Sequence, residues 1–120
     1  MAKLISSPFI IKEGGDRPII IEEYLGKVNS NDESVSIARL KSVEGWIEPA
    51  QAPEFDEYTI VLKGKLRITA NGKVYDVSEG QAIHVLKGER IQYSSPEPGG
   101  AEYIAVCIPA FSAETAHRDK

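Results

Sequence analysis

Acidic residues that could ligate a cation or act as a general base cluster in one short stretch of the sequence. These are Glu48, Glu54, Asp56 and Glu57. Strand alternation places Gln51 on the same face as Glu57 and predicts that Glu54 and Asp56 point away from it. The alternative, and the more common situation for such a cluster, is a solvated strand end.

A second stretch adds an imidazole and a phenol that could work with Glu57. If residues 87–88 form a two-residue turn, His84 lies opposite Ile91 across a hairpin and points inward. His84 would then act as an acid, a base or a ligand, and Tyr93, two residues after Ile91, would orient a bound molecule. A one-residue shift of register turns His84 outward, where it would hydrogen-bond a carboxylate or a backbone group.

Two further side chains are candidates for contact with a ligand. Trp46 could line a pocket together with Tyr93, although a place in the core or in a dimer contact is an open alternative. Arg39 alternates with apolar residues, and if its face is inward its guanidinium needs a carboxylate, from Glu57 or from a ligand. An outer surface is equally open for Arg39. We expect Cys107 to be a small core thiol.

Short β-rich segments must position these residues, because nothing before residue 109 sustains a helical period. Asn71-Gly72 predicts a tight hairpin turn between two of the segments. Ser112 is a candidate N-cap for a short helix over 112–117, and we expect no chemistry from His117 and Arg118 in this polar tail. The pattern indicates one all-β domain over 1–120, a sandwich or barrel. The expected strands cover 8–11, 18–25, 34–40, 57–62, 65–70, 73–77, 81–86, 90–94 and 102–108.

The spacing of five residues resembles the two sequence motifs of the cupin family. The first motif, over 45–64, runs glycine, histidine-x-histidine, glutamate, glycine, and the second, over 80–95, contains two glycines and a third histidine. The matching residues are Gly45, Glu57, Gly64, Gly80 and Gly88. The three histidine positions hold Gln51, Pro53 and Ile91 instead. The resemblance implies a single cupin fold, a jelly-roll-like β-barrel with a short helical tail.

The resemblance also implies a metal site inside the barrel, and this sequence alters it. In cupins with the full motif, three histidines and the glutamate hold one divalent transition metal, and imidazole with carboxylate suits such ions. Only Glu57 remains here, with Gln51 offering an amide oxygen. A relocated site for Zn, Ni, Fe or Mn would use Gln51, Glu57 and His84. The alternative is a barrel without metal.

Two functions follow from the resemblance. The first is binding of a small molecule in an interior pocket; the second is an isomerase, lyase or oxygenase that uses Glu57 and His84, with or without metal. Small cupins often pair, so we expect a homodimer, with 8–25 exchanged at the interface. The net charge of −4 with scattered basic residues argues against a nucleic-acid partner. The sequence has no apolar run of about 20 residues, the length that a membrane span needs, and no leader is evident. We therefore expect a cytoplasmic protein.

Overall fold

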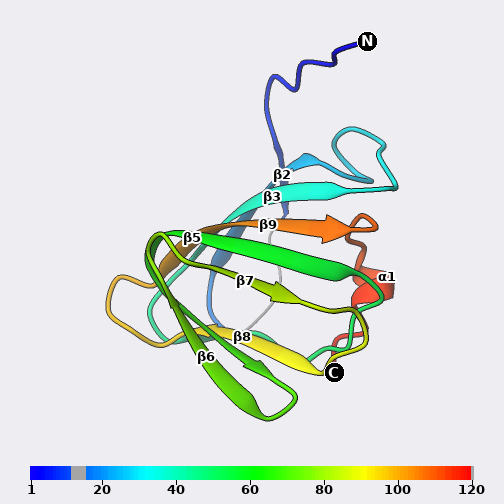
Figure 1. Ribbon diagram of the computed structural model, residues 1–120. Coiled ribbons are helices and arrows are strands. Elements are labelled where there is room, and N and C mark those ends of the chain that lie inside the picture. The colour runs from blue at the N-terminus through cyan, green and yellow to red at the C-terminus, as the bar shows by residue number, and fades with distance from the viewer. Residues whose placement is uncertain (12–15, 120) are drawn as a thin grey trace.

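Nine β-strands form one curled antiparallel sheet in the computed structural model, which describes residues 1–11 and 16–119 (Figure 1). The all-β prediction is therefore confirmed. The predicted tail helix is also present as α1 (Ala113–Ala116), and the Ser112 side chain caps it by accepting a hydrogen bond from the Thr115 amide. The strands are β1 (Phe9–Ile11), β2 (Ile19–Leu25), β3 (Ser36–Ser42), β4 (Trp46–Ile47), β5 (Asp56–Ala70), β6 (Lys73–Ser78), β7 (Ala82–Val85), β8 (Ile91–Ser95) and β9 (Ala101–Ile108).

The long strand β5 joins the two halves of the sheet. Its first part pairs with β9 and β7, and its last part pairs with β6 and β8. The sequence predicted two strands here, over 57–62 and 65–70, because Gly64 reads as a break. Gly64 instead bends a continuous strand at a bulge, with φ of +77°, and a Cβ at this position would lie 2.1 Å from the Gly100 carbonyl oxygen.

The predicted hairpin at Asn71-Gly72 connects β5 to β6. Both residues have positive φ, +50° for Asn71 and +81° for Gly72, and Ala70 pairs with Lys73 across the turn. The short strand β4 was not predicted, because two residues are too few to show alternation. It pairs with β8, and so fixes the segment that leads to Gln51.

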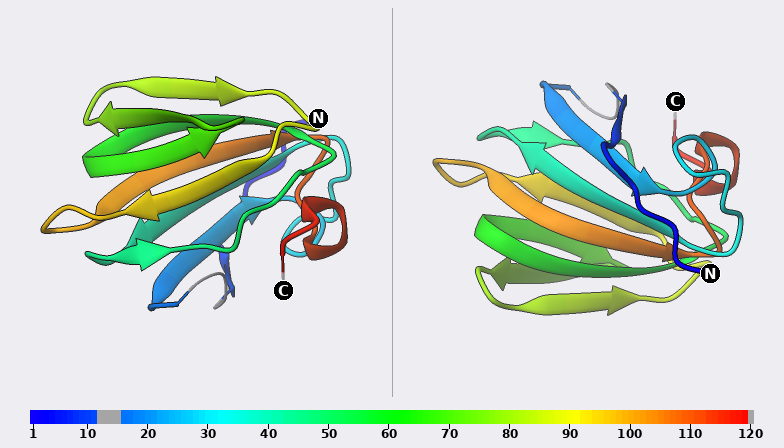
Figure 2. Two further views of the ribbon diagram at one scale, coloured as in Figure 1. Left: turned by 90° about the horizontal axis from the view of Figure 1, so that it is seen from below. Right: turned by 90° about the horizontal axis from the view of Figure 1, so that it is seen from above.

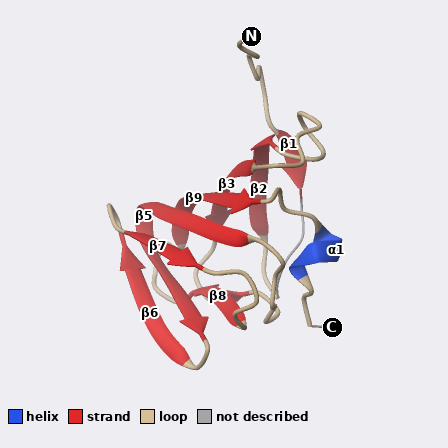
Figure 3. Ribbon diagram, turned by 45° about the vertical axis from the view of Figure 1, so that its right-hand side comes forward, coloured by secondary structure: helices blue, strands red, loops and turns tan. Residues whose placement is uncertain are grey.

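The curled sheet encloses an apolar core, and the C-terminal tail lies over one end of it (Figures 2 and 3). Most buried side chains, among them Leu66 and Ile68 of β5, form one cluster inside the sheet. A second cluster under the tail joins Phe55, Cys107 and Ala116. Cys107 is a buried free thiol, as expected. No helix within 1–11 and 16–119 is long and apolar enough to cross a membrane.

Candidate functional site

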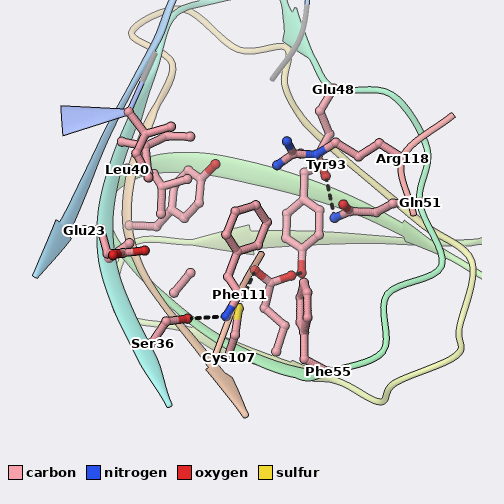
Figure 4. A pocket seen from close by; sticks show the side chains of 16 residues that line it. Glu23, Ser36, Leu40, Glu48, Gln51, Phe55, Tyr93, Cys107, Phe111 and Arg118 are labelled. Carbon is pink, nitrogen blue, oxygen red and sulfur yellow. Dashed lines mark hydrogen bonds between the residues drawn. The ribbon is translucent and has the colours of Figure 1, made fainter. Parts of the chain in front are cut away.

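An interior cavity of about 70 Å³ lies between the two clusters, at the end of the sheet that the tail covers (Figure 4). Its walls are mostly apolar, but polar groups reach it from five strands, from the segment after β4 and from the tail. A mainly apolar concave site with a few converging polar groups is the usual form of a small-molecule pocket. The polar lining residues are Glu23, Ser36, Glu48, Gln51, Glu57, Tyr93, Tyr103, Cys107 and Arg118.

Glu57 is held at the floor of the pocket by two donors from neighbouring strands. The Tyr93 hydroxyl of β8 donates to Glu57 Oε1 at 2.6 Å, and Cys107 Sγ of β9 lies 3.7 Å from Oε2. Burial nevertheless raises the pKa of Glu57, because removal of the carboxylate from water outweighs these two donors. Burial and the Glu57 charge also raise the pKa of Tyr93, so its hydroxyl stays a donor.

A second carboxyl, Glu48, faces the same pocket in partnership with Gln51. Gln51 Nε2 donates to Glu48 Oε1 at 3.1 Å, and the two residues are only 4% and 7% exposed, respectively. Burial first, and the Glu57 charge second, raise the pKa of Glu48 to about 8. The other amide atom of Gln51, Oε1, is buried and has no hydrogen-bond partner among the described residues.

The tail contributes the only cation among the described residues that line the pocket. Arg118 forms an isolated β-bridge with Gln51, and its guanidinium carbon lies 5.2 Å from the centre of the Phe111 ring. Its charge lowers the pKa of Glu48 and of Glu57 against the effect of burial. The neighbouring Asp119 amide donates to the Ala50 carbonyl at 2.8 Å, which helps to hold the tail in place. Arg118, a tail residue from which we expect no chemistry, therefore lies at the pocket.

The structure brings three of the predicted site residues together, namely Gln51, Glu57 and Tyr93. Glu54 and Asp56 point away, as alternation predicts: Glu54 pairs with His117 outside, and Asp56 accepts from the Lys87 amide. Glu48 does not belong to a solvated strand end. No local signal distinguishes it from Glu54, because its burial depends on where β4 packs.

His84 does not face the pocket, and the inward prediction is wrong. β7 pairs with β5 rather than forming a hairpin with β8, so His84 lies opposite Tyr58 on the outer face of the sheet. Its exposed ring stacks on the Tyr58 ring, with centres 4.1 Å apart and planes 13° apart. A turn does join residues 86–89, but the two strands it connects pair with different halves of β5.

Trp46 and Arg39 also lie away from the pocket. Trp46 is 1% exposed and packs in the main core cluster, so it is a core residue rather than a ligand contact. The inward positions of β3 belong to Ser36, Ala38 and Leu40, which line the pocket. Arg39 alternates with them, is exposed on the outer face and donates to Glu102.

The donors around the pocket do not fit a tightly bound transition metal. The proposed ligands Gln51, Glu57 and His84 are not assembled, since His84 is outside. Gln51 and Ile91 stand at two of the three histidine positions of the motif. They are bridge partners, with backbone hydrogen bonds of 2.9 and 2.8 Å, so these two positions are neighbours in the structure. Ile91 and Pro53, however, are buried side chains without a lone pair. Within the described part of the chain, no three His, Cys, Asp or Glu side chains gather at a distance that suits a metal ion.

Comparison with known families places the chain. The model of the family described as "Ethanolamine utilisation protein EutQ" matches residues 28–114, well over half of the chain. This chain belongs to the EutQ family. The EutQ protein of Clostridium difficile has a similar structure, with a TM-score of 0.66 and 23% identity over 86% of this chain and 74% of that one. A predicted oxalate decarboxylase of Thermotoga maritima superimposes with a TM-score of 0.74 and 19% identity, over 91% of this chain and 99% of that one. These similarities confirm the cupin fold.

One curated relative is much longer than this EutQ-family chain. It is a Myxococcus xanthus protein named "Endoribonuclease YbeY", 39% identical over 117 residues. The match covers 98% of this chain but only 39% of the Myxococcus protein. The chain thus spans about two-fifths of that relative, and corresponds to one part of it.

Proposed function

We propose that this chain binds a small polar metabolite in its interior pocket, through hydrogen bonds and charge and without a tightly held transition metal. The observation that carries the proposal is Gln51 Oε1, a buried acceptor without a hydrogen-bond partner among the described residues, on a side chain that lines the cavity. A buried polar atom without a partner costs about 1–3 kcal/mol. A ligand that donates a hydrogen bond to this oxygen recovers that cost, and Gln51 Nε2 stays committed to Glu48.

The cavity limits the size of the ligand. One water molecule needs about 10–15 Å³ of volume measured with a water-sized probe, so the cavity of about 70 Å³ holds about five waters. This space corresponds to a molecule of roughly four to six non-hydrogen atoms. Two- and three-carbon alcohols, amines and acids therefore make the first ligand panel, and the family description adds ethanolamine to it.

Binding of this panel can be measured by isothermal titration calorimetry and by the rise in melting temperature. We expect at least one member to bind saturably to the wild type and to lose most of its affinity in Gln51→Met, which keeps the volume but removes the acceptor. Glu79→Gln, a change at an exposed carboxylate, is the matched control and should bind normally. Failure of the whole panel to bind, or equal binding by Gln51→Met, would contradict the proposal.

Proton transfer is a second candidate function, supported by the two coupled carboxyls that face one pocket. Glu57 is hydrogen-bonded by Tyr93 while Glu48 has its pKa raised to about 8, and unequal carboxyls are suited to act as a base and an acid. Such a pair would serve an isomerase or a lyase. If it acts, a bound ligand exchanges carbon-bound hydrogen with deuterated water, and Glu57→Gln abolishes the exchange. A ligand that binds without exchange would leave the domain a binder.

A further inference from the structure

We propose that the ligand is a small organic monocation, a primary alkylammonium that also carries a hydroxyl group, held between Glu48, Glu57 and Gln51 Oε1. The inference rests on the proposed function of the same pocket and names the chemical class that the pocket accepts. Its basis is the balance of charge and of hydrogen-bonding groups among the lining residues.

The pocket residues carry more acid than base. Among the described residues, three carboxyls and one guanidinium line the cavity, which gives a formal charge of −3 + 1 = −2 when all are ionised. Glu23 is already engaged, because its Oε2 accepts from the Val28 and Asn29 amides at 3.0 and 2.9 Å. The remaining cluster of Glu48, Glu57 and Arg118 has a formal charge of −1. One monovalent cation makes this cluster neutral, whereas an anion would increase the imbalance or require both carboxyls to be protonated.

The hydrogen-bonding groups point to the same class of ligand. Gln51 Oε1 can only accept, and it is buried without a hydrogen-bond partner among the described residues. Glu48 uses one oxygen for Gln51 Nε2, which leaves a second carboxyl oxygen. These two oxygens are the acceptors that we assign to the ligand. An ammonium offers three donors and a hydroxyl offers one more, so an amino alcohol can donate to both oxygens.

Aromatic walls add a surface that suits a cation. Phe55, Tyr93, Tyr103 and Phe111 all line the cavity, and cations are attracted to the faces of such rings within about 6 Å. Arg118 already lies over Phe111 at 5.2 Å, so one positive group is accommodated at this wall. Figure 4 shows the rings of Phe111, Tyr93 and Phe55 in the lining of the pocket, together with Gln51 and Glu48.

Binding of a cation should depend on pH in a defined direction. Glu48, with a pKa of about 8, must lose its proton to pair with the ligand, while a primary alkylammonium keeps its own proton to about pH 10, as lysine does. The charged and titratable groups that face Glu48 are Glu57 on β5, Tyr93 on β8, Tyr103 and Cys107 on β9, Glu23 on β2 and Arg118 in the tail. Neither histidine is among them. The ionised fraction of Glu48 grows from about 1% at pH 6 to about half at pH 8, so affinity should rise on the order of 50-fold.

Three probes of nearly equal size separate the charge classes. Ethanolamine, ethylene glycol and glycolate share a two-carbon hydroxyl skeleton and are cationic, neutral and anionic at neutral pH. Each is titrated calorimetrically into the wild type at pH 6 and pH 8, at matched ionic strength. A ligand of four heavy atoms binds with a Kd no lower than about 40 μM, so millimolar concentrations are needed.

We expect ethanolamine to bind, with the tighter binding at pH 8, and the other two probes to bind at least tenfold more weakly. Glu57→Gln, which retains an acceptor for Tyr93, should abolish ethanolamine binding while Glu79→Gln leaves it intact; unchanged melting temperatures exclude misfolding. The cation inference would be overturned if glycolate or ethylene glycol bound more tightly than ethanolamine, or if the affinity for ethanolamine fell with rising pH. Either result would leave the proposed binding function of the pocket intact. If none of the three binds, the cation inference fails, and only the wider panel decides the pocket function.

Discussion

Replacement of Glu48 by glutamine should make the protein more stable at alkaline pH. Glu48 is 7% exposed, and burial together with the Glu57 charge raises its pKa from 4.5 to about 8. Glutamine has the same shape, can still accept the hydrogen bond from Gln51 Nε2, and never ionises. The substitution therefore removes the cost of a buried negative charge and leaves the packing intact.

The size of the effect follows from the pKa shift. One pKa unit corresponds to about 1.4 kcal/mol, so the shift from 4.5 to about 8 amounts to about 5 kcal/mol. The folded protein holds this proton more tightly than the unfolded chain does. Between pH 4.5 and 8 the unfolded chain therefore binds fewer protons, and the free energy of unfolding falls as pH rises. The loss is absent below pH 4.5 and complete only above pH 8.

Urea unfolding of ligand-free protein between pH 5 and 8.5 measures this directly. Wild type and Glu48→Gln should be about equally stable at pH 5, and the variant should be more stable at pH 8.5, by up to about 5 kcal/mol. A smaller slope should persist in the variant, because the pKa of Glu57 is also raised. Glu79→Gln should follow the wild type. Parallel curves for wild type and Glu48→Gln, or a wild type that gains stability with rising pH, would refute the assignment of Glu48 as a buried acid.

Three shorter predictions test other parts of the structure. Tyr93→Phe removes the 2.6 Å hydrogen bond to Glu57 and should cost about 2 kcal/mol in urea unfolding where Glu57 is ionised, with a smaller loss as falling pH protonates that carboxyl; an unchanged stability at pH 8 counts against the bond. Elemental mass spectrometry of tag-free protein should find substoichiometric transition metal, and EDTA should leave the melting temperature unchanged; a stoichiometric metal that stabilises the fold would contradict the donor analysis. We propose that the expected homodimer uses the outer face of β5, where Tyr58, Ile60 and Leu62 are exposed, so Ile60→Glu should halve the mass measured by light scattering; a wild-type monomer would refute the dimer.

Local signals in the sequence were sufficient for most of the fold. Asn71-Gly72 predicted its hairpin correctly, because the positive φ values that this turn requires are a property of the two residues themselves. Gly64 was misinterpreted, because a glycine marks a bend as well as a break, and only the approach of the Gly100 carbonyl shows which one it is. The partner of β7 was equally out of reach, since strand pairing across 25 residues leaves no local pattern.

The site was predictable only where the motif spacing applied. Gln51 and Glu57 were found because their positions relative to Gly45 and Gly64 match the cupin motif. His84 was misplaced because the side it faces depends on which strand pairs with β7, and a single change of partner reverses it. Arg118 had no signal at all. It reaches the pocket through a single bridge to Gln51, a contact between residues 67 positions apart.

The altered motif changes the balance of charge around Glu57, and the residues that contact this carboxyl can be understood from that balance. In a cupin with the full motif, the glutamate at the position of Glu57 faces a metal cation. Here Ile91 and Pro53 stand at two of the histidine positions, whereas Glu57 remains. Tyr93 and Cys107 donate to it, and Arg118 supplies one positive charge from the tail. Glu48 is a second buried carboxyl, so the two carboxyls share the single positive charge of Arg118 among the described pocket residues. The cation that we propose as ligand would balance the charge of this second carboxyl.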